Sequence, residues 1–194
     1  MTWLAPLLLT LAAPAGGTAA QPVKAERTAR TTVTAELACL HCTFGEGEGC
    51  AVCLKVDDKT PVLLTGRAAK QLEKMRLSKK VAVVTGTLKL NKDKRLVLAS
   101  DEGRLYSEAD KGKVPAKGQA RVEGLPTCGS CNLMVCDECT LAVVNGSAPI
   151  ILDGKLARDH AEGARAITAL GRLFLDKRGL VRLDASKVRL EKAK

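Results

Sequence analysis

Short segments rich in Val, Leu and Ile recur along the chain, and each is bounded by Gly, Asp, Asn or Pro. Segments of this length and composition, with polar residues alternating at their edges, are typical of β-strands. In the first part of the chain the pattern predicts five strands, at 31–39, 52–57, 61–65, 80–90 and 94–101.

The segment 67–77, RAAKQLEKMRL, has a different periodicity. Ala68, Leu72 and Met75 recur on one side at helical spacing, and basic residues occupy the other side, so we predict a short amphipathic helix. The predicted order is three strands, one helix and two strands. This is the order of the OB-fold, a five-stranded barrel with its helix between strands 3 and 4.

The unit occurs twice, which is the most informative property of the sequence. PVLLTG at 61–66 corresponds to PIILDG at 149–154, and each is preceded by a cluster of cysteines. KVAVVTGTLKLNKDKRLVLAS then corresponds to ARAITALGRLFLDKRGLVRLDAS. We therefore predict a mainly β protein of two tandem OB-fold-like five-stranded barrels, each with one short helix between strands 3 and 4.

The two copies define the domain organisation. Domain 1 is expected at 31–106 and domain 2 at 121–194, joined by a linker at 107–120 that is rich in Lys, Gly and Ala. Each domain has about 75 residues, near the size at which small natural domains add disulfides or a metal to their core. Since each copy contains every strand of the unit, we expect the domains to fold separately.

The N-terminal stretch 1–20, MTWLAPLLLTLAAPAGGTAA, is uncharged, with an apolar run followed by small residues. This pattern predicts a secretory signal peptide, followed by an N-terminal extension at 21–30. The mature protein is then exported to the periplasm or the extracellular space, and we expect no transmembrane segment in it.

Composition and charge restrict the choice of partner. Hydrophobic residues make up 46% of the chain but aromatic residues only 2%, so the cores must be built from Leu, Val, Ala and Ile. The formal net charge of +10 favours polyanions as partners. The few aromatic residues argue against a single-strand nucleic-acid binder, which grips bases by stacking. The physiological ligand stays open at this stage.

All eight cysteines lie in two clusters, each made of two C-x-x-C pairs. The first cluster contains Cys39, Cys42, Cys50 and Cys53, with seven residues between the pairs and His41 inside the first pair. The second contains Cys128, Cys131, Cys136 and Cys139, with four residues between the pairs. In the predicted fold each cluster lies at the hairpin between strands 1 and 2.

Two interpretations of the clusters fit this position. Four thiolates can hold one tetrahedral metal ion, zinc or copper, with His41 as a candidate extra ligand in the first copy. Alternatively, export and small domain size favour disulfides, for example Cys39 with Cys53 and Cys42 with Cys50. Redox exchange is disfavoured, because redox C-x-x-C pairs lie at helix N-termini and these are expected on strands.

The stretch VAVVTGTLKL resembles the fourth strand of small bacterial OB-fold domains. CLHCTFGEGEGC, followed by LKVDDKTPVLLTG, resembles a family of small exported cysteine-rich bacterial domains of unknown function, which implies no particular activity. The sequence contains no G-x-S-x-G, H-E-x-x-H or phosphate-binding glycine motif. We expect an exported, non-enzymatic binding or structural protein stapled at each cysteine hairpin, with metal handling and polyanion binding as the alternatives.

Overall fold

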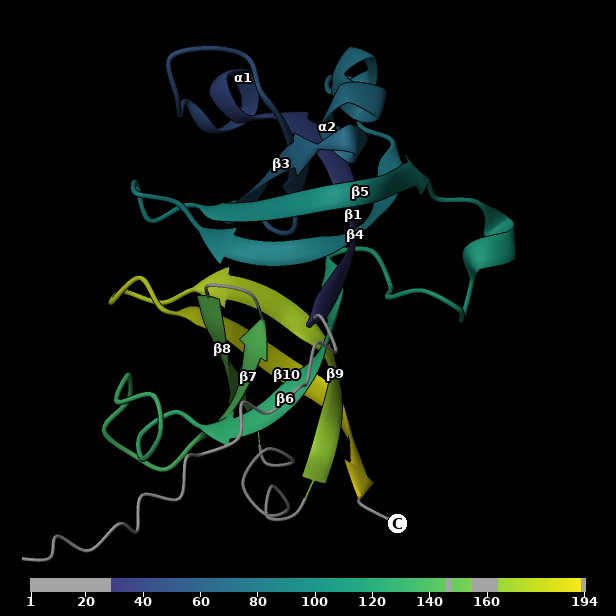
Figure 1. Ribbon diagram of the computed structural model, residues 1–194. Helices are drawn as coiled ribbons and strands as arrows, with labels where there is room; N and C mark the ends of the chain where they lie inside the picture. The colour runs from purple at the N-terminus through teal and green to yellow at the C-terminus, as the bar shows by residue number, and fades with distance from the viewer. Residues whose placement is uncertain (1–28, 146–147, 155–163, 193–194) are drawn as a thin grey trace, which may run out of the picture.

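The computed structural model describes residues 29–145, 148–154 and 164–192. The strands of the N-terminal half (Figure 1) are β1 (Arg30–Cys39), β2 (Val52–Lys55), β3 (Pro61–Gly66), β4 (Val81–Leu90) and β5 (Leu96–Leu105). Helix α2 (Arg67–Leu72) and the 3₁₀ turn η1 (Glu73–Met75) connect β3 to β4. The strands and the helix predicted for this half are confirmed. A second short helix, α1 (Leu40–Phe44), lies in the cysteine segment and was not predicted.

The strands of the N-terminal half close into a five-stranded barrel. β1 pairs with β2, β2 with β3, β5 with β4, and β4 with β1, all antiparallel, and β3 pairs with β5 in parallel. This strand order, with the helix between β3 and β4, is that of an OB-fold. Alternate residues of each strand point into the barrel, and the fully buried Leu37, Leu54 and Leu98 are part of its core.

The strands of the C-terminal half are β6 (Gln119–Cys128), β7 (Leu141–Asn145), β8 (Ala148–Asp153), β9 (Ala164–Leu175) and β10 (Val181–Lys192). Their pairings run in the same order, from β6 through β7, β8, β10 and β9, and β9 pairs with β6. The helix expected between strands 3 and 4 of this copy falls on 155–163, outside the described residues. The predicted signal peptide, and all but two residues of the N-terminal extension, also fall outside them.

A β-bulge recurs at the same place in both halves. At Gly86 the β4–β5 ladder shifts register, and a Cβ there would meet the Ala99 carbonyl oxygen at 2.3 Å. At Gly171 the β9–β10 ladder shifts in the same way, and a Cβ would meet the Asp184 carbonyl oxygen at 2.1 Å. Only glycine permits this backbone approach, which bends the long hairpins round the core.

A strand pairing that the sequence analysis did not foresee joins the two halves. Residues Arg30–Thr34 of β1 pair antiparallel with residues Gln119–Glu123 of β6. Val33 lies opposite Ala120, both are fully buried, and one hydrophobic cluster includes residues of both halves. Figure 1 shows the halves stacked through this junction. The segment 107–120, predicted as a linker, contains the 3₁₀ turn η2 (Glu108–Asp110) and the first two residues of β6.

None of the helices that the structure describes combines the length and the apolar character that a bilayer-crossing helix needs.

Candidate metal centres

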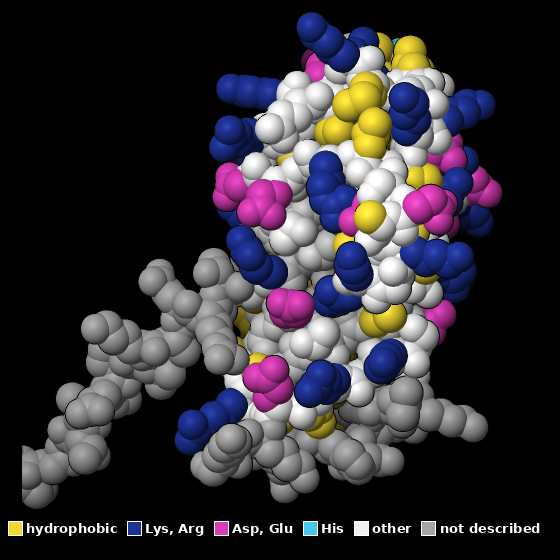
Figure 2. Space-filling model, turned by 90° about the vertical axis from the view of Figure 1, so that its right-hand side faces the viewer, with side chains coloured by type: hydrophobic (Ala, Val, Ile, Leu, Met, Phe, Trp, Pro, Cys, Tyr) yellow, Lys and Arg dark blue, Asp and Glu magenta, His cyan; other side chains and the backbone are white. Residues whose placement is uncertain are grey.

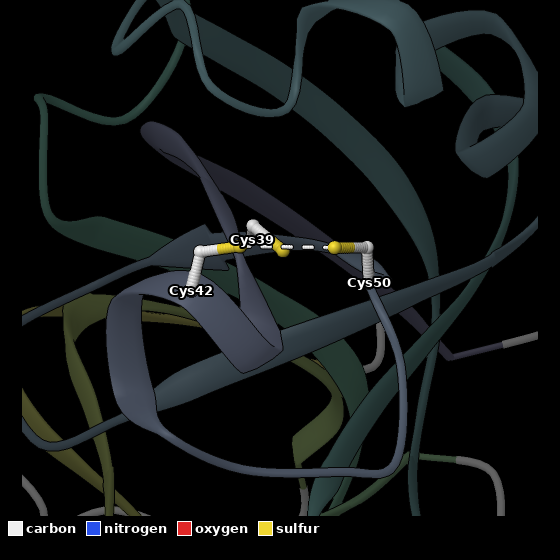
Figure 3. Close-up of side chains that lie close together, drawn as sticks. All are labelled: Cys39, Cys42 and Cys50. Atoms are coloured by element: carbon white, nitrogen blue, oxygen red, sulfur yellow. Dashed lines mark hydrogen bonds between the residues drawn. The ribbon is translucent and has the colours of Figure 1, made fainter.

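Three cysteines of the first cluster converge at one end of the N-terminal barrel. The Sγ atoms of Cys39, Cys42 and Cys50 all lie within 4.8 Å of one another. Cys39 is the last residue of β1, Cys42 lies in α1, and Cys50 lies two residues before β2. Figure 3 shows the three side chains directed toward a common point, although they come from three different segments.

A second group of three thiols lies in the C-terminal half. The Sγ atoms of Cys128, Cys131 and Cys139 also lie within 4.8 Å of one another. Cys128 is the last residue of β6, Cys131 lies in the turn that follows, and Cys139 lies two residues before β7. Of the eight cysteines predicted as site residues, the structure therefore brings together three in each half.

The sulfur separations match a metal site better than a disulfide. The Sγ atoms of Cys42 and Cys50 are 3.7 Å apart, and those of Cys131 and Cys139 are 3.3 Å apart. A disulfide has a sulfur separation of about 2.05 Å. Four thiolates around zinc, at about 2.3 Å from the ion, lie about 3.8 Å from one another. All eight cysteines are free thiols in this structure.

The two groups are equivalent in the backbone as well as in composition. Cys39 pairs with Val52, and Cys50 lies two residues before Val52. Cys128 pairs with Leu141, and Cys139 lies two residues before Leu141. One further hydrogen bond is repeated: Leu40 N–H donates to the Ala51 carbonyl, and Gly129 N–H to the Thr140 carbonyl, each at 2.8 Å.

This equivalence changes how the two sequence clusters are aligned. Aligning the C-x-x-C pairs gives spacers of seven and four residues, whereas the structure aligns Cys50 with Cys139. Both groups then have the same spacing, C-x₂-C-x₇-C. The sequence analysis missed this repeat because it treated every cysteine as a member of a C-x-x-C pair. The signal that could have revealed it is the shared spacing of three cysteines.

The fourth cysteine of the first cluster lies apart from the other three. Cys53 pairs with Ala38 in the β1–β2 ladder, whereas Cys39 pairs with Val52, so Cys53 and Cys39 point to opposite faces. The Cys53 side chain is fully buried in a small cluster with Ala38 and Leu40, and its thiol donates to the Ala38 carbonyl at 3.5 Å.

The fourth cysteine of the second cluster, Cys136, lies close to Gly129. A Cβ placed on Gly129 would lie 2.4 Å from the Cys136 Sγ, so the sulfur sits where a side chain at position 129 would stand. The equivalent positions of the first half are Leu40 and Gly47, and there the Leu40 side chain lies 3.4 Å from a Cβ placed on Gly47. In each half, a side chain at one of the two positions therefore lies close to a glycine at the other.

Hydrogen bonds distribute charge unequally within each group of three thiols. Burial opposes ionisation of Cys39, but the Cys42 backbone N–H and the thiols of Cys42 and Cys50 lower the pKa of Cys39 to about 7. The backbone N–H and the thiol of Cys131 lower the pKa of Cys128 to about 7. Hydrogen bonds to their neighbouring thiols raise the pKa of Cys42 and Cys131 to about 11.

The isolated thiol behaves differently from the grouped ones. Burial, followed by the charge of Cys39, raises the pKa of Cys53 to about 12. A thiol in this environment stays protonated and is neither a good nucleophile nor a ready metal ligand.

His41 is not brought into the first group. Its side chain is exposed, and its Nδ1 atom lies 3.0 Å from the Gly47 carbonyl oxygen. The equivalent position in the second half is Ser130. A histidine ligand common to both halves is therefore absent from the described residues around these thiols.

An arginine contacts the first group only. Burial lowers the pKa of Arg76, but the Glu73 carboxylate and then the Cys50 and Cys39 thiolates raise it, and the net shift is upward. Arg76 also donates to the Glu73 carbonyl oxygen at 3.1 Å, while its buried Nε has no hydrogen-bond partner. The guanidinium therefore supplies positive charge beside the first group of thiols.

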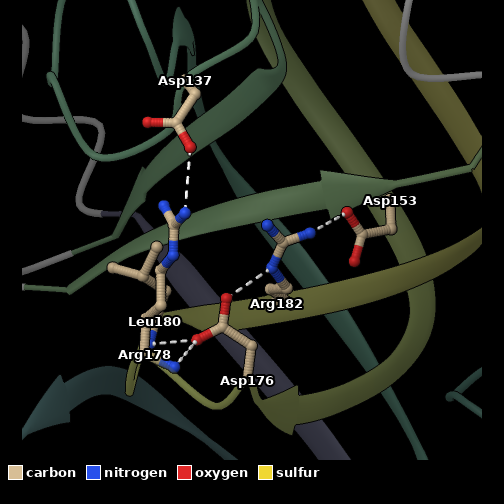
Figure 4. Close-up of polar contacts among 6 residues, drawn as sticks. All are labelled: Asp137, Asp153, Asp176, Arg178, Leu180 and Arg182. Atoms are coloured by element: carbon tan, nitrogen blue, oxygen red, sulfur yellow. Dashed lines mark hydrogen bonds and ion pairs between the residues drawn. The ribbon is translucent and has the colours of Figure 1, made fainter.

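Each cysteine loop is attached to the neighbouring hairpin by one ion pair. In the first half, Arg95 Nε lies 3.1 Å from the Glu46 carboxylate. In the second half, the Arg178 guanidinium donates to Asp137 at 2.9 Å, as Figure 4 shows. Asp176 shapes the hairpin turn by accepting from the backbone N–H groups of Arg178 and Leu180. One carboxylate of each cysteine loop, Glu46 or Asp137, thus has a cationic partner.

Comparison with known proteins assigns the chain to no family. No protein-family model matches the chain, and no curated protein matches it. Among solved structures, one match is a deletion mutant of the single-stranded DNA-binding protein from Thermus aquaticus, with a TM-score of 0.38 and 15% identity. It covers 85% of this chain and 83% of that chain. A TM-score this low carries no argument. The strand pairings and thiols define a β-barrel protein with a three-cysteine group in each half.

Proposed function

We propose that this is an exported, non-enzymatic binding protein that holds a thiophilic metal ion, zinc or copper, at each group of three cysteines. The observation that carries the proposal is the convergence of Cys39, Cys42 and Cys50, repeated by Cys128, Cys131 and Cys139 with the same C-x₂-C-x₇-C spacing. Thiolates are the ligands that select such ions. The uncharged leader at 1–20 supports export.

The repeat supports a second part of the proposal, that the C-terminal half is a second OB-like barrel. Its strands pair in the same order as those of the first barrel, and the β-bulge at Gly171 corresponds to that at Gly86. Two barrels with one thiol group each give a protein with two similar binding sites. The lack of a known catalytic motif in the sequence supports binding rather than catalysis.

Metal content and thiol state of protein purified from its native compartment test this function. If the thiols hold metal, the protein contains metal, and alkylation without chelator leaves the grouped cysteines unmodified. If the cysteines instead form staples, the intact mass is lower by two hydrogens for each disulfide, and metal is absent. In that case Cys42 with Cys50 and Cys131 with Cys139 are the pairs that the short sulfur distances favour. Oxidised, metal-free protein would overturn the metal proposal.

A basic groove supports polyanion binding as a second candidate function. The groove, of about 920 Å³, lies where β6, β9 and β10 meet the segment 111–117. Cationic side chains that line it are Lys111, Lys117, Arg121, Lys187 and Arg189, and two glutamates accompany them. Lys117 pairs with Glu36 at 3.0 Å, and Arg121 donates to the Lys113 carbonyl oxygen at 3.0 Å. The cationic side chains outnumber the glutamates of the groove, which favours an anion. Figure 2 shows basic side chains spread over the full height of the face it presents.

Salt dependence and charge reversal test this second candidate. If a nucleic acid binds, log affinity should fall with log salt by about 0.9 for each phosphate neutralised. K187E together with R189E should abolish binding if the groove is the site, whereas changing Lys70, Lys74, Lys79 and Lys80 to Glu should abolish it if the basic segment around α2 is the site. Loss in neither variant would exclude both surfaces.

A further inference from the structure

We propose that each group of three cysteines binds one copper(I) ion through three thiolates, and that the fourth cysteine of each copy is not a ligand. The inference rests on the proposed function, since it concerns the same thiols, and it names the ion and its ligands. It departs from the four-thiolate site that the paired C-x-x-C spacing indicates.

The two halves have only three thiol donors in equivalent positions. Cys53 lies in β2 at the position that Ala142 occupies in β7. Cys136 lies in the loop at the position that Gly47 occupies in the first half. A four-thiolate site built by this repeat would require a fourth cysteine in the same place in both copies. The repeated part of the site is the group of three.

Neither fourth cysteine lies with the converging thiols, and Cys53 is held away from them by packing. For Cys53 to reach Cys39, it would have to leave its buried position beside Leu40 and cross to the opposite face of the strand. That change requires a one-residue shift of β2, which would also expose Leu54. The Cys136 Sγ lies close to Gly129, and it is not one of the three sulfurs that converge in the second half.

Among the described residues, only cysteines converge at the two sites. His41 Nδ1 is directed at the Gly47 carbonyl, and the second half has Ser130 at the equivalent position. Glu46 and Asp137 are paired with Arg95 and Arg178, and among the described residues no carboxylate joins either group of converging thiols. Zinc held by three protein ligands needs a water as its fourth ligand, whereas copper(I), a soft monovalent ion, is satisfied by three thiolates alone. The described surroundings therefore suit copper(I).

The test uses the full-length mature protein, reduced and loaded with copper(I) without oxygen, so that no redox step is needed. X-ray absorption should show three sulfur neighbours at each copper, with two copper ions bound per chain. C53A and C136A should leave the stoichiometry unchanged and the affinity within about twofold. C42A and C131A, at exposed positions, should each abolish one site while the fold, followed by circular dichroism, is retained.

The outcomes separate this inference from the function on which it rests. Loss of a site in C53A or C136A, or a fourth sulfur neighbour in the spectrum, would overturn the three-thiolate inference and leave metal binding intact. If zinc-loaded protein keeps its zinc when one copper(I) ion is added for each site, the inference that the ion is copper(I) is wrong. Protein that binds neither ion when reduced would refute the proposed function itself.

Discussion

The side-chain amide of Asn145, in the C-terminal half, donates a hydrogen bond to the hydroxyl oxygen of Thr31, in the N-terminal half, at 2.9 Å. Both residues are fully buried. The Asn145 carbonyl oxygen accepts from the Leu88 backbone N–H at 3.1 Å, so one side chain ties β7 to two strands of the other half. Buried polar groups destabilise the folded state unless they are hydrogen-bonded. The Asn145 side chain provides hydrogen-bond partners for the Thr31 hydroxyl and the Leu88 N–H across the junction.

We expect Asn145→Ala to lower the free energy of unfolding by about 1–3 kcal/mol, because it leaves the buried Leu88 N–H without a partner. Asn132→Ala is the matched control: Asn132 also donates to a threonine hydroxyl, that of Thr127 at 3.0 Å, but at an exposed position. Its effect should stay within about 0.5 kcal/mol. Urea denaturation of both variants measures the difference. Equal losses of unfolding free energy in the two variants would show that the buried hydrogen bonds of Asn145 contribute no more than the exposed hydrogen bond of Asn132.

The same junction predicts how the whole chain unfolds. Because β1 pairs with β6 and one core cluster includes both halves, we expect a single cooperative transition in urea. A charged residue at the centre of the junction, Ala120→Asp, should destabilise both halves together. Fluorescent labels, placed in one half or the other, would report the unfolding transition of each half. Two separated transitions in the unmodified chain would show that the halves fold separately, as the repeat alone indicates.

Thiol reactivity should follow the structure rather than the C-x-x-C pairing. In reduced, metal-free, folded protein, the half-buried Cys128 should be alkylated before the exposed Cys131, because the pKa of Cys128 is lowered to about 7 and that of Cys131 is raised to about 11. Cys53 should react only after unfolding, because it is fully buried and its pKa is raised. Peptide mass mapping after timed alkylation measures this order. Early modification of Cys53 would contradict its placement beneath α1.

Arg76 should make the first site bind copper(I) more tightly than the second. Three thiolates around copper(I) carry net negative charge, and the Cys50 and Cys39 thiolates raise the pKa of Arg76, whose guanidinium is therefore the cation expected to stabilise the first site. We expect Arg76→Gln to weaken the first site about threefold to tenfold, which is up to about 1.4 kcal/mol. Competition with a copper(I) chelator, in variants with only one intact site, measures each affinity. Arg67→Gln, on the exposed start of α2, serves as the control.

Stability should depend on pH through Asp110. Hydrogen bonds from the Arg104 guanidinium, at 2.6 Å to one oxygen, and from the Ser107 backbone N–H hold the pKa of Asp110 well below its usual range. A carboxyl pKa that is lower in the folded state gives stability that is complete above the unfolded pKa of about 3.9 and is lost as the pH falls toward the folded pKa.

Asp110→Asn should therefore reduce stability at pH 6, and its difference from the unmodified chain should shrink progressively as the pH falls below about 4. Unfolding free energies measured across this pH range test the prediction. Asp184→Asn removes an exposed carboxylate that lies 3.6 Å from Arg172, and it should change this pH dependence little. A difference for Asp110→Asn that persists unchanged at low pH would refute the assignment.

The sequence by itself determined the strands, the helix and the repeat. Alternation and turn residues predicted all five strands of the first barrel, and the spacing of Ala68, Leu72 and Met75 predicted α2, because these local patterns have one low-energy solution each. The two groups of C-x₂-C-x₇-C were also present in the sequence, and only the alignment of C-x-x-C pairs hid them.

Tertiary structure decided which thiols meet and how the halves join. Whether Cys53 faces Cys39 or the opposite side of the sheet depends on the β1–β2 register, which packing of Leu37 and Leu54 into the barrel fixes. The pairing of Val33 with Ala120 joins residues far apart in the chain, where local patterns carry no information. Both outcomes depend on how much apolar surface the whole molecule buries, and no segment alone determines that quantity.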